Sequence, residues 1–247
     1  MVLIDEEGNS IHAQVYPPVD ELFRTRVKEG GVYTFSYFRV RASNIYFKPV
    51  ENDQMLVFTK WTKVEEVLVV PPAFPMYAYS LASPEQLQAR IDSRTQFTDV
   101  IGVITAISSI GTTQTKLRQG NSTKRTVTIQ TPSNILLDVV LWSERATAFP
   151  ADEVHKDGQT SPQVVLFVGT LVKSFGGMSL SGSSPCKWYI NPDIPDTRKL
   201  LASAKPGYKP IVWSEGSSAA VQKEPAQEKK SLRFWISIHL SIIKLSL

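Results

Sequence analysis

The 247-residue chain contains, twice, the same order of short β-rich segments with one short helix. The first copy covers residues 1–68, and the second covers residues 99–205. In each copy an aromatic residue ends a strand, and a second aromatic follows about thirty residues later. These pairs are Tyr16 with Phe47 and Trp142 with Phe175. Because short, evenly spaced strands are typical of small barrels, we predict an all-β protein of two tandem β-barrels with short capping helices.

The first copy follows the order strand, strand, helix, strand, strand. Residues 19–27 carry apolar side chains at helical spacing, between Pro17–Pro18, which end a strand, and Gly30–Gly31, which end the helix. The second copy has the same order but begins with one more strand, residues 99–108. We therefore expect the first barrel to lack its opening strand, which would leave an unpaired edge.

The segments between and after the two copies differ from them in composition. Residues 69–98 form a predicted linker, in which Ser83–Gln86 has the sequence of a capped helix start. Residues 206–247 are rich in Ser, Gly, Gln, Lys and Glu, which predicts a flexible tail. The apolar run Leu232–Leu247 is either a docking segment or a chain end without a specific role, and we expect the second.

Net charge does not by itself predict a nucleic-acid partner. The formal charge is +4, but residues 1–68 contain 8 Lys and Arg against 10 Asp and Glu, and the excess lies in residues 191–247. A basic surface must therefore come from local clustering. Cys186 is the single cysteine, which excludes an intrachain disulfide and a four-cysteine zinc site, and we expect an inert thiol. We find neither a secretory signal nor an apolar run of about 18 residues, so we expect no membrane partner.

Two aromatic side chains on one face of a small barrel fit the stacking of unpaired bases. Large aromatics more often fill cores, so each of the four has an ordinary structural alternative. In the first copy three further aromatics compete with Tyr16 and Phe47 for the stacking roles. These are Phe38, Tyr46 and Phe58.

Blocks of sequence in the right order give the chain a resemblance to the large subunits of replication protein A, most closely the plant versions, over about residues 1–205. In the second copy the blocks are Asp99–Val103, Lys124–Arg125, Leu141–Trp142, Phe175–Ser181 and Asn191–Asp196. In the first copy they are Leu3–Gly8, Phe23, Gly31–Tyr33 and Asn52–Asp53. The resemblance implies two tandem OB-folds that bind single-stranded DNA in replication, repair or recombination, and a nuclear location.

The resemblance also implies roles for single residues. It places the base-stacking aromatics at Trp142, Phe175, Tyr16 and Phe47. It places cations that contact the phosphate backbone at Lys124 and Arg125, with Arg41 near another such position. Where the family has an arginine, this chain has Leu171, with Lys173 two residues later.

The expected partners are single-stranded DNA and, weakly or not at all, the other replication protein A subunits. Weak assembly is expected because the chain contains neither the family's N-terminal protein-interaction domain nor its zinc-bearing C-terminal domain. The three histidines lie far apart and no catalytic motif is present, so we expect no enzyme, cofactor, metal site or small-molecule substrate. The alternative is a degenerate OB-fold protein that binds other proteins or RNA, which the acidic first copy and its missing strand favour.

Overall fold

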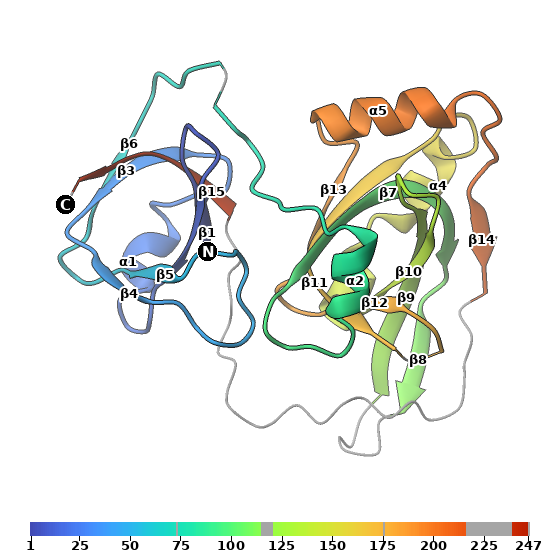
Figure 1. Ribbon diagram of the computed structural model, residues 1–247, viewed down its shortest axis with the longest axis horizontal. Coiled ribbons are helices and arrows are strands. Elements are labelled where there is room, and N and C mark those ends of the chain that lie inside the picture. The colour runs from blue at the N-terminus through green and yellow to red at the C-terminus, as the bar shows by residue number, and fades with distance from the viewer. Residues whose placement is uncertain (73, 115–120, 175, 216–238, 247) are drawn as a thin grey trace. The chain divides into compact units, whose positions relative to one another are not determined.

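The computed structural model describes residues 1–72, 74–114, 121–174, 176–215 and 239–246. The chain forms two compact units (Figure 1). The first unit contains Met1–Ser80, Arg94–Phe97 and the C-terminal residues from Trp235, and the second contains Leu81–Ser93 and Thr98–Phe234. The segment 69–98, predicted as one linker, is therefore divided between the two units.

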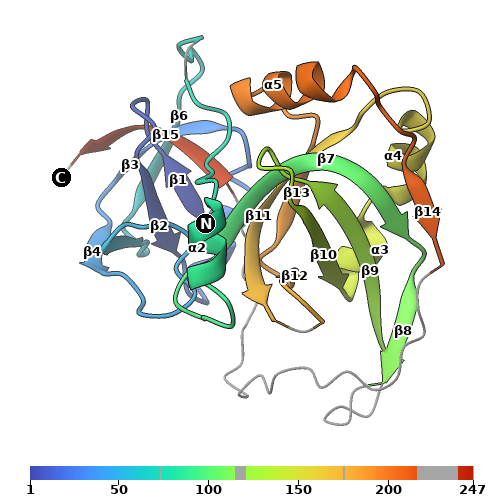
Figure 2. The same cartoon turned by 45° about the vertical axis from the view of Figure 1, so that its right-hand side comes forward.

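The second unit is a closed barrel. Its strands are β7 (Thr98–Ser108), β9 (Asn121–Gln130), β10 (Leu136–Trp142), β11 (Val164–Lys173) and β12 (Ser179–Gly182). β7 pairs antiparallel with β9 and β11, β9 with β10, and β11 with β12, while β10 and β12 are parallel. The ring closes around buried Ile104, Ile129, Leu141, Phe167 and Leu180, as the curved strands in Figure 2 show. This is the OB-fold that the resemblance implies.

Helices close the ends of this barrel. Between β10 and β11, α3 (Glu144–Ala148) and α4 (Ala151–Asp157) place Ala146, Phe149 and Val154 in the core. Before β7, α2 (Pro84–Ala89) has the predicted cap, because the Ser83 hydroxyl accepts from the Gln86 backbone N–H and the Gln86 side chain accepts from the Ser83 N–H. The elements β8 (Gly111–Gln114), β13 (Lys187–Ile190) and α5 (Pro195–Ala204) complete the unit.

The predicted flexible tail begins with residues that are ordered. β14 (Val212–Ser214) pairs with β7 in parallel, and the preceding Ile211 is 2% exposed. The Tyr208 hydroxyl donates to the Gly158 carbonyl at 2.5 Å. The composition of the tail obscured this short apolar stretch, which packs onto the second unit as a sheet edge.

The first unit repeats most of the barrel. It contains β1 (Val2–Ile4), β2 (Ser10–Gln14), α1 (Glu21–Arg24), β3 (Val32–Ser36), β4 (Arg39–Ala42), β5 (Gln54–Val57) and β6 (Lys63–Glu66). β1 and β2 are antiparallel, β2 and β5 are parallel, and β4 and β5 are antiparallel. These pairings correspond to β9 with β10, β10 with β12, and β11 with β12 in the second unit. The core contains Leu3, Ala13, Phe35, Leu56 and Phe58.

A strand from the far end of the chain fills the place of the missing opening strand. β15 (His239–Ser246) pairs with β1 on one side and with β3 on the other. It is parallel to both neighbours, whereas β7 is antiparallel to both of its counterparts in the second unit. The edge that we expected to be unpaired is therefore covered, and the apolar run at the chain end, expected to have no role, supplies the strand.

Candidate nucleic-acid interface

The outer face of the second barrel presents the predicted stacking residue Trp142. Side chains alternate along each strand, and Leu141 and Leu180 point into the core. Trp142 and Ser181 therefore point outward, and the indole Nε1 donates to the Ser181 Oγ at 3.2 Å. The indole is half-buried, so it is neither sealed in the core nor free to rotate. This hydrogen bond between neighbouring strands fixes the position of the ring on the outer face.

The neighbouring cations Lys124 and Arg125 lie on opposite faces of β9. Lys124 stands directly opposite Trp142 in the ladder and shares its face, although its side chain is largely covered, with 8% exposed. Arg125 points the other way, and its Nε donates to the Ala146 carbonyl at 3.1 Å. Its guanidinium also lies 5.9 Å from the ring centre of Trp213.

The position of Arg125 differs from the predicted one. Adjacent residues of a strand point to opposite sides, so Lys124 and Arg125 cannot both contact a strand laid over Trp142. Burial lowers the pKa of the Arg125 guanidinium, and Asp152 partly opposes this effect. The structure therefore gives Arg125 a packing position between α3 and β14, away from the outer face.

Lys173 lies at the end of β11, opposite Ser179 and on the outer face. Its Nζ is 3.9 Å from one carboxylate oxygen of Asp92, and the other oxygen accepts from the Ser174 hydroxyl at 2.5 Å. A phosphate at Lys173 would therefore compete with this carboxylate. Phe175, the second predicted stacking residue, lies outside the described residues, in the connection between β11 and β12.

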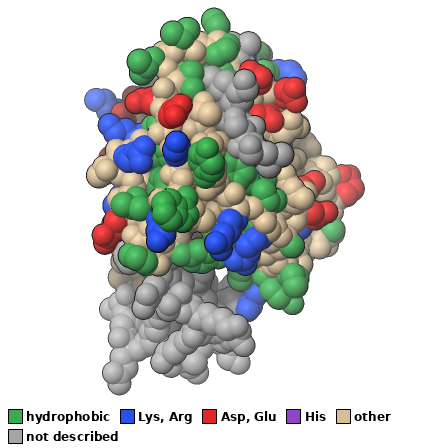
Figure 3. All heavy atoms as spheres, turned by 90° about the vertical axis from the view of Figure 1, so that its left-hand side faces the viewer, with side chains coloured by type: hydrophobic (Ala, Val, Ile, Leu, Met, Phe, Trp, Pro, Cys, Tyr) green, Lys and Arg blue, Asp and Glu red, His purple; other side chains and the backbone are tan. Residues whose placement is uncertain are grey.

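The first unit places Tyr16 and Arg41 on the corresponding face. Tyr16 follows the end of β2, as Trp142 ends β10, and it is 48% exposed, with its hydroxyl donating to the Gln14 side chain. Arg41 is exposed on β4, opposite Met55 of β5, which in turn neighbours β2. On the side of the molecule drawn in Figure 3, Lys and Arg side chains lie among hydrophobic ones.

Sequence reasoning missed Arg39, which lies on the same face of β4 as Arg41. Arg39 is exposed and stands opposite Val57. The signal was present, because Arg-Val-Arg alternates with the period of a strand. Part of the same sheet face is covered by the chain itself, since Val2 and Ile4 are buried against Ala78.

Phe47 lies in the connection between β4 and β5, which corresponds to the connection that holds Phe175. Its ring is half-buried against Phe97, with 5.8 Å between ring centres, and its backbone N–H donates to the Arg94 carbonyl at 2.7 Å. Its neighbour Tyr46 is 61% exposed and offers a more open ring. Among the other competitors, Phe58 is a core residue and Phe38 packs against the core.

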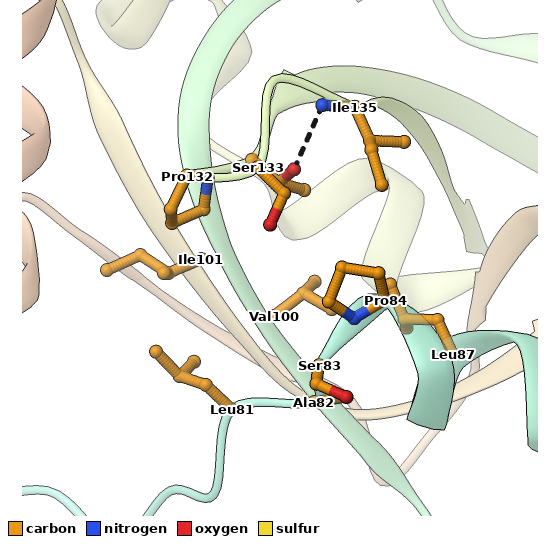
Figure 4. Close-up of a pocket in the computed structure, with 11 residues that line it drawn as sticks. Leu81, Ala82, Ser83, Pro84, Leu87, Val100, Ile101, Pro132, Ser133 and Ile135 are labelled. Atoms are coloured by element: carbon orange, nitrogen blue, oxygen red, sulfur yellow. Dashed lines mark hydrogen bonds between the residues drawn. The ribbon is translucent and has the colours of Figure 1, made fainter.

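A cavity of about 270 Å³ lies in the second unit between the start of α2, β7 and the turn after β9 (Figure 4). Its lining is mostly apolar and contains no titratable side chain. The apolar lining residues are Leu81, Ala82, Pro84, Leu87, Val100, Ile101, Pro132 and Ile135. The cavity is at the turn end of the β9–β10 hairpin, whereas Lys124 and Trp142 pair at the other end, so it does not belong to the candidate interface.

The described residues contain no cluster of three or more His, Cys, Asp or Glu side chains that could hold a metal ion. Within the same ranges, no helix has the length and hydropathy that crossing a membrane requires. Cys186 is fully buried, and burial raises the pKa of its thiol to about 12, which keeps it protonated and unreactive.

Comparisons with known proteins agree with the barrel and its motifs. Residues 87–191 match the family model described as the replication protein A OB domain, and residues 1–87 match a domain of unknown function, DUF223. A replication protein A 70 kDa DNA-binding protein of Arabidopsis thaliana is 28% identical over 198 residues, which cover 80% of this chain and 31% of that protein.

Further similar proteins come from other lineages. The replication protein A 70 kDa DNA-binding subunit of Xenopus laevis is 28% identical over 204 residues, which cover 81% of this chain and 31% of that protein. The chain thus spans about a third of the length of these relatives. A solved structure of a replication protein A heterotrimer bound to single-stranded DNA has 25% identity and a TM-score of 0.58, covering 88% of this chain and 49% of that one. By sequence and by fold, the chain resembles the large DNA-binding subunit of replication protein A.

Proposed function

We propose that the chain binds single-stranded DNA with little sequence preference, in nuclear replication, repair or recombination. The observation that carries the proposal is the position of Trp142, half-buried on the outer face of the second barrel and fixed by Ser181. The equivalent placement of Tyr16 and Arg41 in the first unit supports it. The relatives named above are DNA-binding subunits, which supports a binding role and not an enzymatic one.

The mechanism follows from stacking and charge. A base stacked on an aromatic ring contributes about 1–3 kcal/mol whatever its identity, because every base has a π-face. Lys and Arg side chains near the phosphates release counterions, so affinity falls as salt rises. Duplex DNA hides its base faces, which gives preference to single strands. Two barrels on one chain raise the effective concentration of the second contact once the first has formed.

The partners of the related proteins suggest a second question. A solved relative is a heterotrimer bound to single-stranded DNA, which supports single-stranded DNA and other replication protein A subunits as the general class of partner. We propose that this chain contacts the two smaller subunits weakly or not at all, as expected from its sequence. Stable co-purification with them would contradict this.

One observation favours the alternative of an RNA- or protein-binding module. In the first unit Val2 and Ile4, on the sheet face that corresponds to the interface, are buried under Ala78. A strand laid on the first unit must therefore keep to the side of β2, β4 and β5. Binding of oligo-rU as tight as that of oligo-dT would favour this alternative.

Replacing Trp142 by Ala tests the proposal. We expect affinity for oligo-dT to fall about 5- to 150-fold, the loss of one stacked base, and to fall further when Phe175 is also replaced by Ala. Trp142→Phe keeps a π-face and should retain most of the affinity. Fluorescence anisotropy with oligo-dT, oligo-rU and duplex DNA at two salt concentrations measures the effect. Equal affinity of Trp142→Ala and Trp142→Phe would reject the stacking role.

A further inference from the structure

Two large aromatic side chains of the first unit are strongly exposed next to lysines. Trp61 is 70% exposed and Tyr37 is 66% exposed. The Lys60 Nζ lies 5.0 Å from the ring centre of Trp61, and the Lys63 Nζ lies 5.2 Å from that of Tyr37. Together with Arg39, these residues form a surface that we call the Tyr37–Trp61 patch. Neither ring was among the predicted stacking residues.

The backbone holds the two halves of the patch together. Thr62 is 5% exposed, and its hydroxyl donates to the Tyr37 carbonyl at 3.1 Å while accepting from the Thr59 N–H at 2.9 Å. The Trp61 N–H donates to the Thr59 hydroxyl at 3.1 Å. The turn that carries Trp61 is thus tied to the residue that carries the other ring, so the patch is a fixed feature of the fold.

Tyr37 adopts a backbone conformation that does not suit its side chain. Its φ is 59°, in the left-handed region where glycine is favoured and bulky residues are rare. Glycine would be the more stable choice here, yet the chain has an exposed aromatic ring. Strained positions of this kind cluster at binding sites, where the surrounding structure holds them in place.

The patch is basic within a unit that is acidic. Arg39, Lys60 and Lys63 are all exposed, and among the described residues none of them forms an ion pair. By contrast, Arg24 and Lys48 of the same unit are paired with carboxylates. Three unpaired cations beside two open rings suit a polyanion with flat, stackable groups.

The patch is continuous with the candidate interface. Arg39 stands opposite Val57 on β5, and Val57 in turn neighbours Gln14 on β2, whose side chain accepts from the Tyr16 hydroxyl. Tyr37 precedes Arg39 by two residues on the way into β4. A strand that crosses Tyr16 can therefore proceed over Arg39 to Tyr37 and Trp61.

We propose that the Tyr37–Trp61 patch is an additional contact site for single-stranded nucleic acid, which extends the track of the first unit beyond Tyr16. This inference rests on the proposed function. Tyr37 and Trp61 each stack on one base, and Arg39, Lys60 and Lys63 contact the adjoining phosphates.

The test combines Tyr37→Gly with Trp61→Ala. Tyr37→Gly relieves the left-handed strain, so the variant should fold at least as well at this position, which thermal unfolding checks. We expect affinity for an oligo-dT of about 30 nucleotides, long enough for several OB-fold sites, to fall about 5- to 150-fold per lost ring. The matched control is Leu22→Ala, which removes a half-exposed apolar side chain of α1 from the same unit and should not change affinity.

Two more measurements separate the possible outcomes. Lys60→Gln with Lys63→Gln should reduce the slope of log affinity against log salt by about 1.4, since each phosphate contact to a single strand contributes about 0.7. Cross-linking of a bromodeoxyuridine-substituted strand should label the peptides that contain Tyr37 and Trp61.

If the wild-type chain does not bind oligo-dT, the proposed function fails and the patch fails with it. If Trp142→Ala weakens binding but the Tyr37→Gly, Trp61→Ala chain binds as tightly as the Leu22→Ala control, the patch alone is wrong. An unchanged salt slope in the lysine variant would likewise overturn the phosphate contacts and leave a protein partner as the occupant of the patch.

Discussion

Single residues show how alternation within a strand separates neighbours in the sequence. Lys124 and Arg125 form a dibasic pair in the sequence, but the strand sends one to the outer face and the other to α3. A matched block of sequence gives the position of a motif in the chain without saying which of two adjacent side chains faces a ligand. The register of β9 against β10 supplies that information, and sequence alone does not fix register.

This difference makes a prediction for the two cations. Lys124→Gln should leave the fold intact and reduce the salt dependence of oligo-dT binding by about 0.7 in the log–log slope. Arg125→Gln should instead destabilise the second unit by about 1–3 kcal/mol, because it loses the hydrogen bond to Ala146 and the contact with Trp213. Urea unfolding and anisotropy titrations of both variants measure the two effects. A stable Arg125→Gln chain with a reduced salt slope would place Arg125 on the interface after all.

At the scale of elements, local signals were more reliable than distant ones. The cap of α2 was readable because Ser83, Pro84 and Gln86 act within one turn. The repeated order of strands was readable because turn residues separate them. The strands β14 and β15 were not predicted, because each owes its structure to a partner far away in the sequence, β7 for one and β1 with β3 for the other.

The role of β15 can be tested with a single proline. Ile242→Pro removes a backbone N–H within the strand between β1 and β3 and should destabilise the first unit by about 1–3 kcal/mol, the cost of an unsatisfied buried group. Lys230→Pro, placed before the strand, is the matched control. Hydrogen exchange followed by mass spectrometry should show faster exchange in β1 and β3 and no change in β9 and β10. Equal exchange in both variants would contradict a structural role for β15.

At the scale of the whole molecule, the two units differ in how acid affects them. His12 is buried in the first unit between β1 and β5, and burial, aided by the N-terminal ammonium, lowers its pKa to about 3. In the second unit His155 is not buried and its ring meets that of Trp213.

The lowered pKa predicts a loss of stability in mild acid. Above pH 6.5 His12 is neutral in the folded and unfolded states, so pH has no effect through it. Below that pH the unfolded chain takes up a proton that the folded chain excludes, and the free energy of unfolding should fall by up to about 1.4 kcal/mol per pH unit toward the folded pKa. Urea unfolding between about pH 7 and about pH 5, followed by methyl resonances of each unit, measures the slope. A first unit whose pH slope is unchanged in His12→Gln would contradict this assignment.

The position of β15 also bears on the order in which the two units are assembled during synthesis. Val2 pairs with His239, so the ribosome must release the whole second unit and β15 before the gap between β1 and β3 can close. The second barrel closes with strands that all lie between residues 98 and 182, and it can be complete while β15 is still being translated. The first unit is thus translated before the second and finished after it, and until then its two open strands need protection from pairing with other nascent chains.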